Sequence, residues 1–220
     1  MIVDDVRAIL GLLSREAASD LSAVWANADP SWSSADFRAY VEAAFPELVL
    51  PYSAAAADVG VEMYETAATT SDGFVAVEGD LPSAERLSGS ARWALDAGMG
   101  DGAVALLSGA ADRAILDGLR DTITTNVGRE PGARWARYAS ATACPFCRML
   151  ATRDDYLSES TAGFKSHDNC HCIPTPIRPG GDVDRPAYVD RWKDEYQQAR
   201  KSAGSGDPKA IVAAWGRLIR

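Results

Sequence analysis

The sequence lacks the long apolar run that a membrane-spanning helix requires. No segment of the 220 residues approaches about 20 consecutive apolar positions, so no membrane association is expected. The first residues, MIVDDVRAILGLLSREA, place acidic side chains where a signal peptide has basic ones, and they offer no small-residue cleavage site. We therefore expect a protein that is made and kept in a reducing cytoplasm, where lasting disulfides are rare.

The sequence also lacks the common catalytic signatures. It contains no Gly-rich P-loop, no Gly-x-Ser-x-Gly elbow and no His-Glu-x-x-His metal-binding pair. The zinc deaminases use His-x-Glu followed by Pro-Cys-x-x-Cys, but no His-x-Glu is present and Ala143 precedes Cys144. We therefore expect a protein that is not an enzyme.

Basic side chains are in the minority, and they are unevenly spread. The formal net charge is −9, which argues against a surface built wholly for nucleic acid. From residue 185 onward there are eight basic and four acidic residues, a net charge of +4, which leaves −13 for the rest. The pattern indicates a basic region that contacts an acidic protein surface or DNA, and a merely solvated basic helix is the alternative. The partner-binding residues expected there are Arg191, Lys193, Arg200 and Lys201.

Apolar periodicity predicts a domain of antiparallel helices over residues 1–128. Apolar residues recur at spacings of three and four between Val6 and Val24, which is typical of an amphipathic helix. Gly128, followed by Pro131-Gly132, marks the end of this region. The other expected helices run from an N-cap at Ser34 to Phe45, where Pro46 interrupts or restarts the run, then over 52–68, from Ser83 to Leu95, and from 101 to 127.

Beyond this boundary the periodicity changes and predicts a small mixed module over residues 129–180. A strand is expected within 133–144, helical turns at 146–152, a loop or hairpin at 153–166 and a brief strand at 171–174, ended by Pro176. Residues 181–220 are expected to form a basic helical tail. Its two helices are predicted at 186–201 and 208–218, joined by Gly204-Ser205-Gly206.

All four cysteines and both histidines lie in one stretch, CPFCRMLATRDDYLSESTAGFKSHDNCHC, from Cys144 to Cys172. Cys144 and Cys147 form a Cys-x2-Cys pair, and His167 and Cys170 repeat this spacing after an interval of 19 residues. Two close ligand pairs separated by a loop are typical of a tetrahedral structural zinc site.

Cys172 adds a fifth candidate ligand to this pattern. If residues 170–172 are extended, Cys170 and Cys172 share one face and His171 points away, so either cysteine can complete the site. A zinc ion would contribute on the order of 10 kcal/mol of binding energy to a module with little core of its own. We expect structural zinc held by four of five residues: Cys144, Cys147, His167, Cys170 and Cys172.

Two alternatives to a metal site stay open. Four cysteines could form two disulfides or remain free thiols, although disulfides need no neighbouring histidine. A catalytic thiol would require Cys144 or Cys147 beside His167 with an orienting third group, for which Asp168 and Asn169 are present. Metal binding accounts for the close spacing of cysteines and histidines better than either alternative.

The motifs also follow one another in a familiar order. A strand with Trp135 and Arg137 precedes Ala143-Cys144-Pro-Phe-Cys147-Arg-Met-Leu150, Tyr156, Thr161-Ala162-Gly163-Phe164, His167-x2-Cys170-His171-Cys172 and Pro174. This order resembles the C-terminal domain of Mu-F-like phage minor head proteins of the actinobacteriophage type. The resemblance covers about residues 133–176 of the chain.

The resemblance implies a phage minor capsid, or head morphogenesis, protein that acts in procapsid assembly. Its location would be the virion, at the capsid interior or portal vertex, and the host cytoplasm during assembly. The implied partners are the portal protein and the major capsid or scaffold protein. Packaged DNA as a further partner of the basic tail rests on the +4 charge of residues 185–220 alone. The five candidate ligands match the family's cysteines and histidine. Similar chains are also labelled capsid maturation proteases, so a protease is the alternative function, beside a zinc-dependent nucleic-acid-processing enzyme.

The expected fold class combines these elements. It is α+β and mainly α, with an N-terminal antiparallel helical region, a small zinc-stapled α/β module and a helical C-terminal tail.

Overall fold

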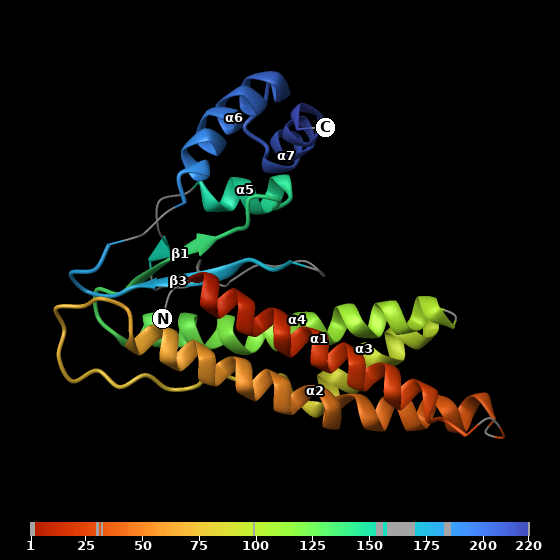
Figure 1. Ribbon diagram of the computed structural model, residues 1–220. Coiled ribbons are helices and arrows are strands. Elements are labelled where there is room, and N and C mark those ends of the chain that lie inside the picture. Colours follow the sequence, from red (N-terminus) through yellow and green to blue (C-terminus); the bar gives the residue numbers. More distant parts are fainter. Residues whose placement is uncertain are drawn as a thin grey trace.

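Four helices build the larger part of the molecule in the computed structural model, which describes residues 3–29, 31, 33–98, 100–152, 156–157, 170–182 and 186–219. They are α1 (Val3–Ala26), α2 (Ser34–Glu65), α3 (Ala84–Ala97) and α4 (Asp101–Arg129). Successive helices run in opposite directions along an elongated bundle (Figure 1). The predicted antiparallel helical region is therefore confirmed.

Helix α2 continues through two prolines, so the predicted break at Pro46 is wrong. The helix spans 32 residues with Pro46 and Pro51 inside it, and its N-cap is Ser33 rather than Ser34. A proline inside a helix costs about 3 kcal/mol because it removes a hydrogen bond and crowds the preceding turn. Pro46 is buried, and its neighbours Val41, Phe45 and Val49 form the face of α2 that packs against α3 and α4. Burial of that face offsets the local cost.

Helices α2 and α4 lie very close to each other because a glycine stands at their contact. A Cβ atom added to Gly118 of α4 would lie 2.3 Å from the carbonyl oxygen of Ser53 in α2. Ser53 itself is fully buried. The apolar core around this contact joins α1, α2 and α4 to the sheet, and it includes Leu10, Tyr64, Leu119, Ile123, Trp135 and Ile173.

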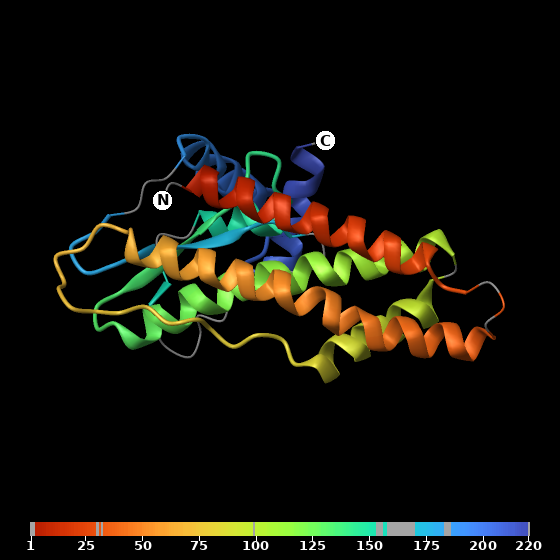
Figure 2. The same ribbon diagram turned by 60° about the horizontal axis from the view of Figure 1, so that its bottom comes forward.

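An extended segment connects α2 to α3 along the outside of the bundle (Figure 2). Side chains of α4 form the hydrogen bonds to the backbone of this segment that a neighbouring strand would otherwise supply. The Asn126 amide accepts from the Val77 N–H at 2.9 Å and donates to the Val77 carbonyl at 2.7 Å. The Thr122 hydroxyl accepts from the Gly79 N–H at 2.9 Å. These bonds fix an 18-residue connection (66–83) that contains no helix or strand.

The strands form a small antiparallel sheet that lies on α4. They are β1 (Arg134–Tyr138), β2 (Tyr156–Leu157) and β3 (Ile173–Ile177), in the order β2-β1-β3. The predicted second strand is shifted: β3 begins at Ile173 and continues through Pro176, which faces Trp135 of β1. Pro174 and Pro176 are tolerated because β3 is an edge strand, where alternate positions need no partner for their N–H.

Three helices complete the fold on the side of the sheet away from the bundle (Figure 1). They are α5 (Pro145–Ala151), α6 (Tyr188–Ala203) and α7 (Pro208–Leu218), and α6 ends at Gly204 with a φ of 60°. Their apolar side chains, including Met149, Trp192, Ile211 and Trp215, share one core with Cys147, Cys170 and Cys172. The region predicted as a tail thus packs around the cysteines. The fold is α+β and mainly α, as predicted.

A buried ion pair joins the ends of three elements. The carboxylate of Glu130, just after α4, accepts from Arg178 Nε at 2.9 Å and from the Tyr64 hydroxyl at 2.8 Å. The Arg178 guanidinium also lies 5.3 Å from the centre of the Tyr64 ring. Burial raises the pKa of Glu130, but the hydrogen bonds from Arg178 and Tyr64 outweigh it and hold the pKa below its ordinary value.

We predict that Glu130 makes the fold sensitive to acid. Because its pKa is lowered in the folded state, its stabilisation is fully present above the unfolded-state pKa of about 4.3 and is lost as the pH falls through the folded-state value. Glu130→Gln should lower the free energy of unfolding by roughly 3 kcal/mol at neutral pH, because it leaves Arg178 buried without its counter-charge. Urea unfolding between about pH 3 and pH 7 measures both effects.

The exposed carboxylate of Glu62 in α2 provides the control for this experiment. Glu62→Gln should leave both the neutral-pH stability and the acid sensitivity close to those of the wild type. An acid sensitivity that is the same in Glu130→Gln and in the wild type would contradict the assignment to Glu130.

Candidate metal centre

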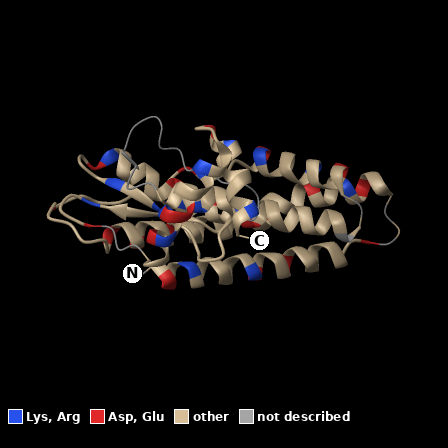
Figure 3. Ribbon diagram, turned by 90° about the horizontal axis from the view of Figure 1, so that it is seen from above, with Lys and Arg blue, Asp and Glu red and all other residues tan. Residues whose placement is uncertain are grey.

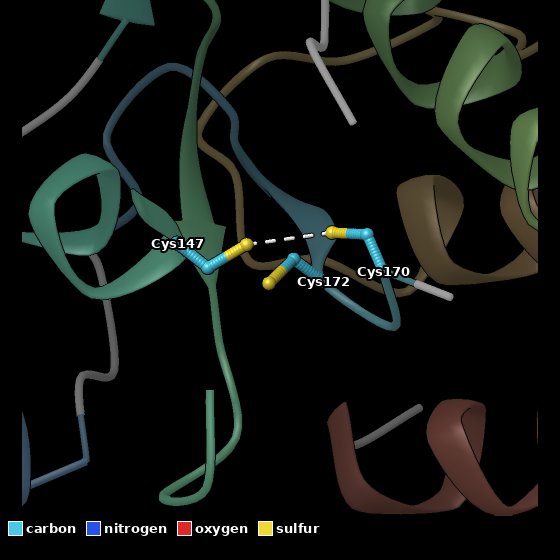
Figure 4. A group of neighbouring side chains, drawn as sticks. All are labelled: Cys147, Cys170 and Cys172. Atoms are coloured by element: carbon cyan, nitrogen blue, oxygen red, sulfur yellow. Dashed lines mark hydrogen bonds between the residues drawn. The ribbon is translucent and has the colours of Figure 1, made fainter. Parts of the chain in front are cut away.

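Three cysteine side chains meet in a buried cluster between α5 and the segment that leads into β3. The sulfur atoms of Cys147, Cys170 and Cys172 all lie within 4.8 Å of one another, and those of Cys147 and Cys170 are 3.4 Å apart. Figure 4 shows the Cys147 and Cys170 side chains pointing toward each other, with the sulfur of Cys172 beside them. Each of the three residues is at most 4% exposed.

Cys144 lies beside this cluster, at the start of α5. It is the N-cap of the helix, and its side chain hydrogen-bonds to that of Cys147. The Arg148 side chain fixes the preceding loop, since its Nε donates to the Ala143 carbonyl at 2.8 Å and its Nη2 to the Ala141 carbonyl at 3.2 Å. The first turn of α5 and the loop before it, which Arg148 holds, therefore position the predicted Cys-x2-Cys pair.

The expectation for residues 170–172 is confirmed. Cys170 and Cys172 both face the cluster, whereas the side chain of His171 is 62% exposed. His171 Nδ1 lies 3.9 Å from the carboxylate of Asp112 in α4, which also accepts a hydrogen bond from Ser14. His167, another predicted ligand, lies outside the described residues. The structure thus brings Cys147, Cys170 and Cys172 together, places Cys144 within hydrogen-bonding reach of Cys147, and turns His171 away.

The sulfur positions fit a tetrahedral metal ion. Zinc–sulfur bonds of about 2.3 Å in tetrahedral geometry place neighbouring sulfur atoms about 3.8 Å apart. The spacing in the cluster, 3.4 Å for the closest pair and within 4.8 Å for all three atoms, brackets this value. The four cysteines are free thiols, so the disulfide alternative is not the arrangement that the structure shows.

The clustered thiols shift one another's pKa values in opposite directions. Hydrogen bonds from Cys147 and Cys172, together with the nearby Arg120 guanidinium, lower the pKa of Cys170 below its ordinary value. Hydrogen bonds to Cys144 and Cys170 raise the pKa of Cys147. The pKa of Cys170 is therefore lowered and that of Cys147 raised by their mutual hydrogen bond. A divalent cation can replace the shared protons and allow all of the thiols to ionise.

Sequence reasoning missed Arg120, which is fully buried and whose side chain donates to the backbone at Cys170 and Cys172. The one available signal was its position on the apolar stripe of α4. Leu116 stands four residues before it and Ile123 three residues after it, and both are buried. A charged residue on such a stripe indicates a buried partner.

The model of one protein family matches most of the chain. The family is described as VG15 protein, and the match covers residues 2–199. The chain belongs to the VG15 protein family. This is a phage virion-gene family, so the chain is a phage protein. No curated protein and no solved structure matches the chain. None of the described helices is long and apolar enough to cross a membrane.

The predicted partner-binding residues lie on α6. Arg191 is 3.5 Å from Glu195, and Lys193 is 3.7 Å from Asp190, so both cations are paired with acids of their own helix. Arg200 and Lys201 are exposed in its last turn. Figure 3 shows basic and acidic residues interspersed over the face in view rather than gathered by sign.

We predict that the chain binds a metal ion through the cysteine cluster. Protein purified without added metal should contain about one ion per chain, and Cys147→Ser should lose it because only two of the three clustered sulfurs remain. Elemental analysis of the purified protein measures the content.

His171→Ala is the matched control, because His171 stands between two cysteines but faces away from them. It should keep the metal. Loss of metal from His171→Ala to the same extent as from Cys147→Ser would contradict this cysteine site.

Proposed function

We propose that the chain is a minor capsid protein that acts in phage head morphogenesis. It would dock to the portal or the inner shell during procapsid assembly and remain in the virion. Two observations support this proposal: the VG15 family covers residues 2–199, and residues 133–176 resemble the C-terminal domain of Mu-F-like minor head proteins. The buried cysteine cluster carries the proposal, because its cysteines are among the residues that carry that resemblance.

The metal that we propose is zinc, held by Cys144, Cys147, Cys170 and Cys172. Soft thiolates select zinc among the common divalent ions, and four of them satisfy its tetrahedral geometry. The hydrogen bond between Cys144 and Cys147 supports Cys144 as the fourth ligand. His167 is then not needed.

The role that we propose for this zinc is structural rather than catalytic. A catalytic zinc keeps an open coordination position for water or substrate. The burial of Cys147, Cys170 and Cys172 argues against access of a substrate to such a position. The zinc would connect α5 to the segment before β3, and so hold the core of α5, α6 and α7 to the sheet.

The proposed partner-binding surface lies on α6, which belongs to the core that the zinc would hold to the sheet. We propose that α6 and α7, once fixed by the metal, present the exposed side chains of Arg200 and Lys201 to an acidic portal surface or to packaged DNA. Arg191 and Lys193 would contribute less, because neighbouring acids already offset their charge.

The ligand set is tested by replacing zinc with cobalt(II), whose absorption spectrum reports thiolate ligands. We predict that His167→Ala keeps the metal and the wild-type cobalt spectrum. Cys144→Ser should lose one thiolate contribution and bind the ion more weakly. A wild-type spectrum in Cys144→Ser and an altered one in His167→Ala would instead assign the fourth position to His167.

The function is tested in the phage itself. We predict that quantitative mass spectrometry finds the chain in proheads and mature virions at a copy number far below that of the major capsid protein. A phage that carries Cys147→Ser should assemble fewer DNA-filled heads, whereas the His171→Ala phage should match the wild type. Absence of the chain from both proheads and virions would contradict the proposal. Cleavage of a co-expressed major capsid or scaffold protein would favour the protease alternative.

A further inference from the structure

A buried arginine of the helical bundle reaches the cysteine segment. Arg120 lies in α4, and its side chain is 1% exposed. Its Nε and Nη2 donate to the Cys172 carbonyl oxygen at 3.1 and 2.9 Å, and Nη2 also donates to the Cys170 carbonyl oxygen. Its Nη1 donates to the Asp117 carboxylate at 3.0 Å. One guanidinium therefore holds two backbone positions that lie two residues apart.

This contact fixes the conformation that aims the sulfur atoms. In an extended segment the carbonyl groups of residues i and i+2 lie on the same edge, and their side chains lie on the same face. A planar guanidinium with several donors can bond to both carbonyl groups, whereas a lysine ammonium is a flexible point charge. By holding the carbonyls of Cys170 and Cys172 together, Arg120 keeps both sulfur atoms directed to the cluster.

The charge of Arg120 also fits a metal–thiolate centre. Its carboxylate partner Asp117 is shared with Arg86 at 3.5 Å and Arg113 at 3.8 Å, so three arginines surround one acid. A buried cation is costly unless negative charge lies close to it. A zinc ion with four thiolates carries a net negative charge, and Arg120 stands beside the backbone of two of its ligands.

We infer that Arg120 is a positioning residue of the metal centre, which presets Cys170 and Cys172 for the ion and couples metal binding to α4 of the bundle. This inference rests on the proposed zinc site. The metal centre would then link the core of α5, α6 and α7, which contains Cys147, to the helical bundle, which contains Arg120. Groups around a first ligand shell typically change metal affinity by about 10- to 100-fold when they are replaced.

The test uses the full chain with Arg120→Lys and, as a matched control, Arg178→Lys. Arg178 is also a buried arginine, but it pairs with Glu130 away from the cysteines. Zinc affinity is measured by competition with a chromophoric chelator, and stability by urea unfolding. Arg120→Lys should lower zinc affinity by about 10- to 100-fold and still give a thiolate spectrum with cobalt(II). Arg178→Lys should lower stability and leave zinc affinity within about twofold of the wild type.

The possible outcomes separate this inference from the proposed function. No metal in the wild-type protein would overturn the zinc site itself and the inference with it. Equal zinc affinity in Arg120→Lys and the wild type would overturn only the role of Arg120. Should Arg120→Lys fail to fold, hydrogen exchange in the wild type decides the question. Amides of α4 around Arg120 should exchange more slowly with zinc than after its removal, and unchanged exchange there would overturn the inference.

Discussion

The contact between the cysteines of α5 and those before β3 is the constraint on which the C-terminal half of the structure depends. Cys147 comes from a seven-residue helix, and Cys170 and Cys172 come from a segment that is not a strand. Neither element has enough length to hold its position alone. The core of α5, α6 and α7 gathers around these sulfur atoms, and Trp192 and Trp215 are fully buried in it. Whatever fixes the sulfur atoms therefore fixes the three helices against the sheet.

The helical bundle supports this contact from the other side. Helix α4 is held against α2 through the close approach at Gly118, and it carries both Arg120 and the side chains that fix the 66–83 connection. Helix α4 thus packs against α2, forms the hydrogen bonds that hold the 66–83 connection, and contacts the cysteine segment through Arg120. The buried ion pair of Glu130 and Arg178 lies at the end of the bundle, where α4 ends and the chain enters the sheet.

The helices and the cysteine cluster could be predicted from the sequence because both depend on local patterns. Apolar spacing located α1 and α4, Ser83 located the start of α3, and the Cys-x2-Cys spacing located the pair at the start of α5. Alternation correctly turned His171 away from Cys170 and Cys172. The continuity of α2 through Pro46 could not be predicted, because it depends on burial against α3 and α4 rather than on local preference. The role of Arg120 could not be predicted either, because its partners lie 50 and 52 residues away in the sequence.

Zinc K-edge X-ray absorption of the purified protein tests the central claim most directly, because it reports the atoms bound to the ion. The account predicts a first shell made only of sulfur, with four zinc–sulfur distances of about 2.3 Å. A shell dominated by nitrogen and oxygen, or protein that carries no zinc, would contradict it.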